Sequence, residues 1–198
     1  MGKHTLVVIG ISIALASQQI AFAYPRQLTD QDIRSAVEYG TSRKGSDLVS
    51  DGHPNFIKVP RALAGFIVVY TPWLQIASIA QDAATEYRTL TQDEISRTLS
   101  MWQGKLKVVV ALVEQREGRW YDGHAVWIQG AKVIQPITKS GHLLRVISCR
   151  TNPCFVMGGM IFTFPDDNLD VTSGAEFVII LRGGYAEYRV NVPLGLLR

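Results

Sequence analysis

The sequence predicts an α+β fold in which helices precede a mainly antiparallel set of strands. Signals for helix N-termini occur only before Gly104, and after Gly104 the period of the apolar residues changes from about 3.6 to about 2. About eight strand-like runs are separated by turn residues, as in β-sandwiches. With 198 residues, of which 47% are hydrophobic, the chain is predicted to have a helical part at 24–104 and a sandwich at 105–198 that form one compact unit.

Three helices are expected. Thr29-Asp30-Gln31-Asp32 resembles a capping box and begins a helix from about Asp30 to Tyr39. After a strand at Gly65 to Tyr70, Thr71-Pro72 supplies an N-cap and a first-turn proline. A third helix begins at the capping box Thr91-Gln92-Asp93-Glu94 and ends at Gly104. The second helix is expected to bury one face, made of Trp73, Ile76, Ala77, Ala80, Ala84 and Tyr87.

The strands after Gly104 are expected to pair as hairpins. Alternating residues from Leu106 to Val113 predict a strand that enters a core. Gly130 and Gly183-Gly184 each separate two further strand-like runs, and Gly158-Gly159 is expected to mark a bulge. The predicted architecture is a Greek-key, immunoglobulin-like antiparallel β-sandwich, with helices before it and inserted after its first strand.

The first 23 residues have the pattern of a secretory signal peptide. Lys3 precedes an apolar run from Leu6 to Ala16, and Ala21-Phe22-Ala23 matches a signal-peptidase site, so the mature chain would begin at Tyr24. The alternative is a membrane anchor, but an apolar helix of this length covers only about half of a ~30 Å hydrocarbon layer. The sequence therefore predicts an exported protein, periplasmic or secreted, without a membrane span after cleavage.

Both cysteines lie in one short segment, Cys149-Arg150-Thr151-Asn152-Pro153-Cys154. Asn-Pro favours a chain reversal between two strands, which would place the sulfurs opposite each other. In an oxidising compartment we expect a structural disulfide between Cys149 and Cys154. The alternative is a redox pair, but the two-residue spacing of thioredoxin-like motifs is missing.

The order signal peptide, short helix, strand, Thr71-Pro72-Trp73 helix and run of strands resembles small exported bacterial proteins that have no assigned function. Val69-Tyr70-Thr71-Pro72 is the distinctive motif. The resemblance implies a location in the envelope or outside the cell and contributes no catalytic residue.

Charge and motif content exclude several functions. Twenty Lys and Arg against seventeen Asp and Glu are too evenly balanced and spread for a nucleic-acid partner. The nucleophile elbow, the phosphate-binding loop, the dinucleotide fingerprint and the H-E-x-x-H zinc motif are all missing from the sequence. No cofactor is predicted, and the chain is interpreted as non-catalytic rather than as an enzyme.

Two sets of residues are weak metal candidates. His53, His124 and His142 each follow a glycine, and with Asp122 they could surround zinc. The favoured alternative is that Asp-Gly and Ser-Gly are turns followed by a surface histidine. Asp166, Asn168 and Asp170 alternate like calcium ligands, but Val171 replaces the loop glycine of an EF-hand, and capping of turns is the favoured interpretation.

The strongest candidate for recognition is the loop from Glu114 to His124. It contains Arg116, Arg119, Trp120 and Tyr121, residue types that are enriched at binding hot spots. These side chains could contact a protein or glycan partner in the cell envelope, or the two aromatic residues could fold back and fill the end of the sandwich. The leading hypothesis is an exported binding module, and the alternative is a zinc-dependent hydrolase that uses the histidine loops.

Overall fold

The computed structural model describes residues 25–62, 64–116, 122–148, 154–182 and 186–198, with the backbone alone at 114–116, 122, 142–148, 154–157 and 182. The described residues form the helices α1 (Asp30–Ser42), α2 (Pro72–Thr85) and α3 (Gln92–Trp102), the strands β1 (Phe56–Lys58), β2 (Ala64–Tyr70), β3 (Lys105–Arg116), β4 (Asp122–Gln129), β5 (Lys132–Ile134), β6 (Thr138–Ser148), β7 (Cys154–Pro165), β8 (Gly174–Arg182) and β9 (Ala186–Pro193), and a 3-10 turn at Leu194–Leu196.

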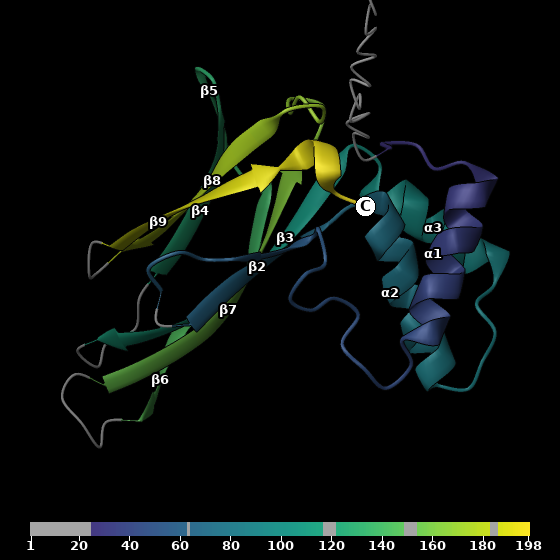
Figure 1. The fold of residues 1–198 in the computed structure, drawn as a ribbon, viewed down its shortest axis with the longest axis horizontal. Coiled ribbons are helices and arrows are strands. Elements are labelled where there is room, and N and C mark those ends of the chain that lie inside the picture. Colours follow the sequence, from purple (N-terminus) through teal and green to yellow (C-terminus); the bar gives the residue numbers. More distant parts are fainter. Residues whose placement is uncertain (1–24, 63, 117–121, 149–153, 183–185) are drawn as a thin grey trace, which may run out of the picture.

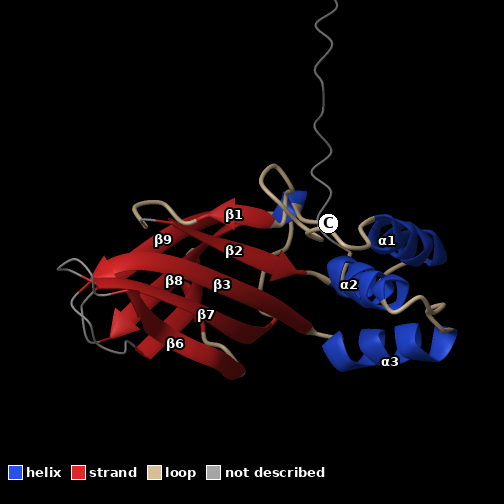
Figure 2. Cartoon of the chain, turned by 90° about the horizontal axis from the view of Figure 1, so that it is seen from below, coloured by secondary structure: helices blue, strands red, loops and turns tan. Residues whose placement is uncertain are grey.

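The strands form two antiparallel sheets, which confirms the predicted α+β class. One sheet has the order β1-β2-β3-β7-β6 and the other β5-β4-β8-β9. The sheets lie face to face, as in a β-sandwich, with the helices at one end (Figures 1 and 2). The chain changes sheet between β3 and β4, between β5 and β6, and between β7 and β8.

Alternate residues of both sheets bury their side chains in one core. Trp127 of β4 lies at its centre, with its ring centroid 4.8 Å from that of Phe177 on β8 and 6.1 Å from that of Phe164 on β7. Edge-to-face packing of these rings adds to the free energy gained by removing them from water. The aromatic contacts thus join the two sheets.

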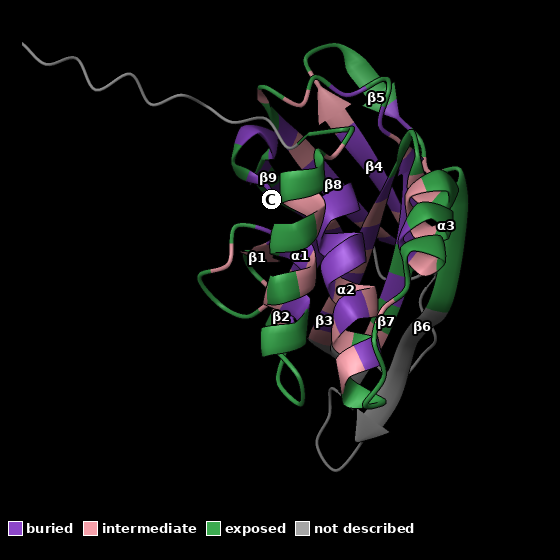
Figure 3. Ribbon diagram, turned by 90° about the vertical axis from the view of Figure 1, so that its right-hand side faces the viewer, coloured by how far each residue is buried: buried purple, intermediate pink, exposed green. Residues whose placement is uncertain are grey.

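The helices begin where the sequence predicts, because each N-cap hydrogen bond is local. The side chain of Thr29 accepts from the N–H of Asp32, and Thr71 and Thr91 cap α2 and α3 in the same way. Helix α2 lies between α1 and α3 and is the most buried of the three (Figure 3). The apolar face of α2 packs against the outer face of β2 and β3, and together they form a second hydrophobic cluster.

Gly40 explains how closely α1 approaches α2. A Cβ atom added at Gly40 would lie 2.0 Å from the carbonyl oxygen of Ala77, so any larger residue would force the helices apart. Tyr87 was expected on the buried face of α2, but the structure does not place it there. The helix ends at Thr85, and Tyr87 has φ +57° and an 88% exposed side chain.

Two further features of the sheets differ from the sequence analysis. Strand β1 was not expected, since three residues without alternation leave no pattern in the sequence. The expected bulge at Gly158-Gly159 is present on one side of β7 only: β7 pairs with β3 without interruption there, whereas its register with β6 shifts opposite Gly158. The irregularities lie in the partner strand β6, between His142 and Arg145 and between Val146 and Ser148.

Candidate functional site

Termini of strands from both sheets lie at the end of the sandwich away from the helices (Figure 1). Arg116 at the end of β3 pairs with Cys154 at the start of β7, and Asp122 at the start of β4 pairs with Arg182 at the end of β8. Ser148 closes β6 opposite β7. The β3–β4, β6–β7 and β8–β9 connections therefore all leave the same end of the sandwich.

The predicted recognition residues belong to the first of these connections. Arg116 is the last residue of β3, and Arg119, Trp120 and Tyr121 lie outside the described residues. The strands on either side belong to different sheets. The connection thus crosses from one sheet to the other, as expected for a loop at the end of a sandwich.

The predicted disulfide lies in the second connection. The pairing of Ser148 with Phe155 confirms the expected hairpin between β6 and β7. Cys154 begins β7, whereas Cys149 lies outside the described residues. The Cys149–Cys154 bond therefore remains a prediction.

Two of the candidate zinc ligands, His53 and His124, have different surroundings in the described structure. His53 packs against Tyr39 of α1, with 5.8 Å between ring centroids, whereas His124 lies near the start of β4, where Nε2 is 2.9 Å from Oε1 of Gln135. His142 and Asp122 are strand residues whose side chains are not described. Among the described residues no group of three or more His, Cys, Asp or Glu side chains could hold a metal.

Only one of the three glycines before these histidines lies in a turn. Gly52 has φ +91° in the connection before β1. Gly123 and Gly141 instead lie within β4 and β6, so the turn interpretation of Asp122-Gly123 and Ser140-Gly141 is wrong. A Cβ at Gly141 would lie 2.6 Å from the carbonyl oxygen of Gly159, so close approach of strands requires glycine there.

The candidate calcium residues have separate structural roles. Asp166 is buried, and the guanidinium of Arg26 donates to the carbonyl oxygens of Asp166 and Leu169 at 2.5 Å each. Burial raises the pKa of the Asp166 carboxyl, and Arg26 opposes this effect. Asp170 accepts from the N–H and hydroxyl of Thr172, and Asn168 is exposed. The carboxylates of Asp166 and Asp170 thus have separate partners, Arg26 and Thr172, which favours the turn-capping interpretation.

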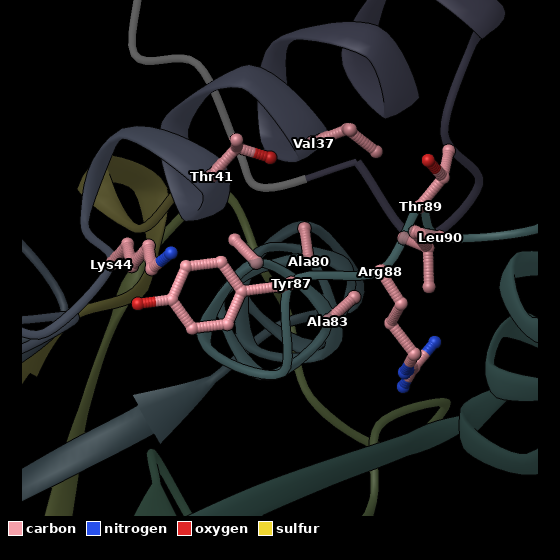
Figure 4. A pocket seen from close by; sticks show the side chains of 10 residues that line it. Val37, Thr41, Lys44, Ala80, Ala83, Tyr87, Arg88, Thr89 and Leu90 are labelled. Atoms are coloured by element: carbon pink, nitrogen blue, oxygen red, sulfur yellow. The ribbon is translucent and has the colours of Figure 1, made fainter.

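A groove between α1 and α2 was not expected from the sequence. Its volume is about 380 Å³, its floor includes Ala80 and Ala83, and the Nζ atom of Lys44 lies 3.2 Å from the ring centroid of Tyr87 at its rim (Figure 4). Tyr87 occupies the left-handed conformation that glycine usually adopts after a helix. An exposed aromatic ring beside a floor of alanine methyl groups suits contact with an apolar group. The periodicity of the sequence does not indicate this groove.

Comparison with protein-family models, curated proteins and solved structures finds no match for this chain. None of the helices in the described part of the chain is long and apolar enough to cross a membrane. The structure is that of an α+β protein with two antiparallel sheets. Helices cover one end of the sandwich, and strand connections leave the other end.

Proposed function

We propose that the chain is an exported, non-catalytic module with an immunoglobulin-like sandwich, which binds a protein or glycan of the cell envelope through the loop that contains Arg116, Arg119, Trp120 and Tyr121. The observation that carries the proposal is the meeting of the β3–β4, β6–β7 and β8–β9 connections at one end of the sandwich. Loops held on a rigid scaffold are frequent sites of recognition.

The strand order supports the immunoglobulin-like topology. Without β1, the sheets are β2-β3-β7-β6 and β5-β4-β8-β9. Numbered along the chain as A to G, with an extra strand C′ after C, these are A-B-E-D and C′-C-F-G, the order of immunoglobulin-type sandwiches. Trp127 also corresponds to the buried tryptophan of strand C. Here the rings of Phe164 and Phe177 pack against it, whereas in antibody domains the tryptophan packs against a disulfide between strands B and F.

This correspondence supports the choice of loop. In antibody variable domains the B–C and F–G loops belong to the binding surface. The equivalent connections are β3–β4, which holds Trp120 and Tyr121, and β8–β9. Arginine, tryptophan and tyrosine in the first of them match the composition of binding hot spots.

The test begins with capture of a partner from a native envelope extract by the mature protein. The purified partner is then titrated against wild type, against W120A/Y121A and against the control Y87A, which removes an exposed aromatic ring at the opposite end. We expect W120A/Y121A to weaken binding by about 2 kcal/mol or more and Y87A to bind like wild type. Unchanged binding by W120A/Y121A, or loss by Y87A alone, would contradict the proposal.

Metal analysis tests the hydrolase alternative separately. Protein purified without chelator is expected to contain no stoichiometric zinc. About one zinc per chain, with a hydrolytic activity that a chelator removes, would favour the enzyme and reject the non-catalytic module.

A further inference from the structure

Three aromatic rings form a connected cluster where the helices meet the sandwich. Tyr39 of α1 lies 5.1 Å from Trp73 of α2 and 5.8 Å from His53, measured between ring centroids. The hydroxyl of Tyr39 donates to the carbonyl oxygen of Leu48, and the indole N–H of Trp73 donates to the hydroxyl of Ser35. These hydrogen bonds hold both rings in fixed positions.

Two guanidinium groups lie over this cluster. The Cζ atom of Arg43 is 5.2 Å from the ring centroid of Tyr39, and that of Arg198 is 5.5 Å from the ring centroid of Trp73. Both arginines are exposed, and neither forms an ion pair with a carboxylate in the part of the chain that the structure describes. Stacking on a ring orients the guanidinium plane and leaves its N–H groups at the edge free to donate.

His53 adds a third donor. Its Nδ1 accepts from the backbone N–H of Asn55 at 3.1 Å, so the neutral ring carries its proton on Nε2. Burial is the largest cause that lowers the pKa of His53, and the positive charges of Arg198 and Arg43 lower it further. Both arginines therefore act on the same imidazole, although they come from distant parts of the chain.

Buried polar residues fix the backbone of Arg198. The side chain of Asn55, which is fully buried, accepts from the N–H of Arg198 at 3.0 Å and donates to its carbonyl oxygen at 3.0 Å. The buried hydroxyl of Thr71, the N-cap of α2, donates to the same oxygen. Two buried polar side chains thus fix the backbone of a residue whose own side chain is exposed.

We propose that Arg43, Arg198 and the Nε2–H of His53 bind a tetrahedral oxyanion, as carried by a phosphate or sulfate group. Two arginine forks supply bidentate donors that match the oxygens of such a group. The positive charges of two guanidinium groups favour a dianion over a single carboxylate. This site lies at the helical end and is independent of the loop that contains Trp120 and Tyr121.

The proposal predicts a linkage between anion binding and the charge of His53. Tyr39 packs against the imidazole, and Arg43 and Arg198 are the charged groups that act on it. A bound dianion would stabilise the imidazolium and raise the pKa of His53. By reciprocity, the anion would bind more tightly as the pH falls through that pKa.

The experiment is an NMR pH titration of the histidine rings in the folded protein, in sodium sulfate and in sodium chloride of equal ionic strength. Sulfate is the probe because its charge stays constant over the titration. We expect the pKa of His53 to be higher in sulfate than in chloride. Inorganic phosphate and glycerol phosphate, added at constant pH, then distinguish a free anion from an ester as the preferred ligand.

Charge-matched variants make the test specific. R43Q and R198Q should each weaken sulfate binding about tenfold, whereas R97Q, which removes an exposed arginine on α3, should bind like wild type. R198Q retains the backbone contacts to Asn55, so its fold should persist. A pKa of His53 that is the same in sulfate and chloride would overturn the proposal. Equal losses in all three variants would also overturn it, because they would show general charge screening.

Discussion

At the helical end of the sandwich, polar side chains join segments that are far apart in the chain, whereas at the opposite end short segments connect successive strands. Asn55 and Thr71 bind the backbone of Arg198, and Arg26 binds the carbonyl oxygens around Asp166. The opposite end consists of the termini of β3, β4 and β6 to β9. The comparison suggests that the helical end fixes the fold, which leaves the connections at the other end open to serve recognition.

The largest expected effect on stability is at Asn55. N55A removes the donor to the carbonyl oxygens of Val69 and Arg198 and the acceptor for the N–H of Arg198, all at a fully buried position. We expect the free energy of unfolding to fall by about 3 kcal/mol, because buried polar groups lose their partners. Denaturant unfolding measures this, with the exposed Asn168 as control: N168A should change stability by less than about 0.5 kcal/mol. A change in the free energy of unfolding as small as that of N168A would contradict the view that buried hydrogen bonds at the helical end fix the fold.

The next effect concerns the end with the strand connections. If Cys149 and Cys154 form a disulfide, C149S/C154S should lower the free energy of unfolding by about 2 kcal/mol, because the bond restricts the unfolded chain. The fold and partner binding should persist. Reducing agent should destabilise wild type by the same amount and leave the double variant unchanged. If reducing agent has no effect on wild type, the disulfide is absent.

A smaller, pH-dependent effect is expected at Asp166. Burial raises the pKa of this carboxyl in the folded state above its unfolded value of about 3.9. The folded protein therefore binds the proton more tightly, and this group reduces stability as the pH rises from about 3.9 through the folded pKa. D166N should be more stable than wild type at neutral pH, and the difference should vanish in acid. Lower stability of D166N at neutral pH would show that the ion pair with Arg26 outweighs burial.

Local chemistry explains which features the sequence could predict. The capping residues Thr29, Thr71 and Thr91 lie three residues or fewer from their hydrogen-bond partners, so the starts of the helices are visible in the sequence. Alternation likewise predicts the strands that face one core. In contrast, the contact between Asn55 and Arg198 spans 143 residues of sequence, and no local pattern reports it.

The candidate sites follow the same rule. The position of the predicted loop at one end of the sandwich could be predicted, because turn signals and the period of the strands indicate where the strands end. The groove at Tyr87 could not be predicted, since a tyrosine there adopts a conformation that usually indicates glycine or asparagine. The grouping of Tyr39, His53 and Trp73 was also missed, because the contact between Trp73 and Arg198 joins distant parts of the chain.

The most direct test of the central claim is the free energy of unfolding of W120A/Y121A, measured by denaturant titration beside wild type. If these side chains are available for a partner at the end away from the helices, the double variant should lie within about 0.5 kcal/mol of wild type. If they fill the end of the sandwich instead, stability should fall by about 3 kcal/mol or more, as buried aromatic truncations do. The first result is the one predicted here, and the second would contradict recognition through this loop.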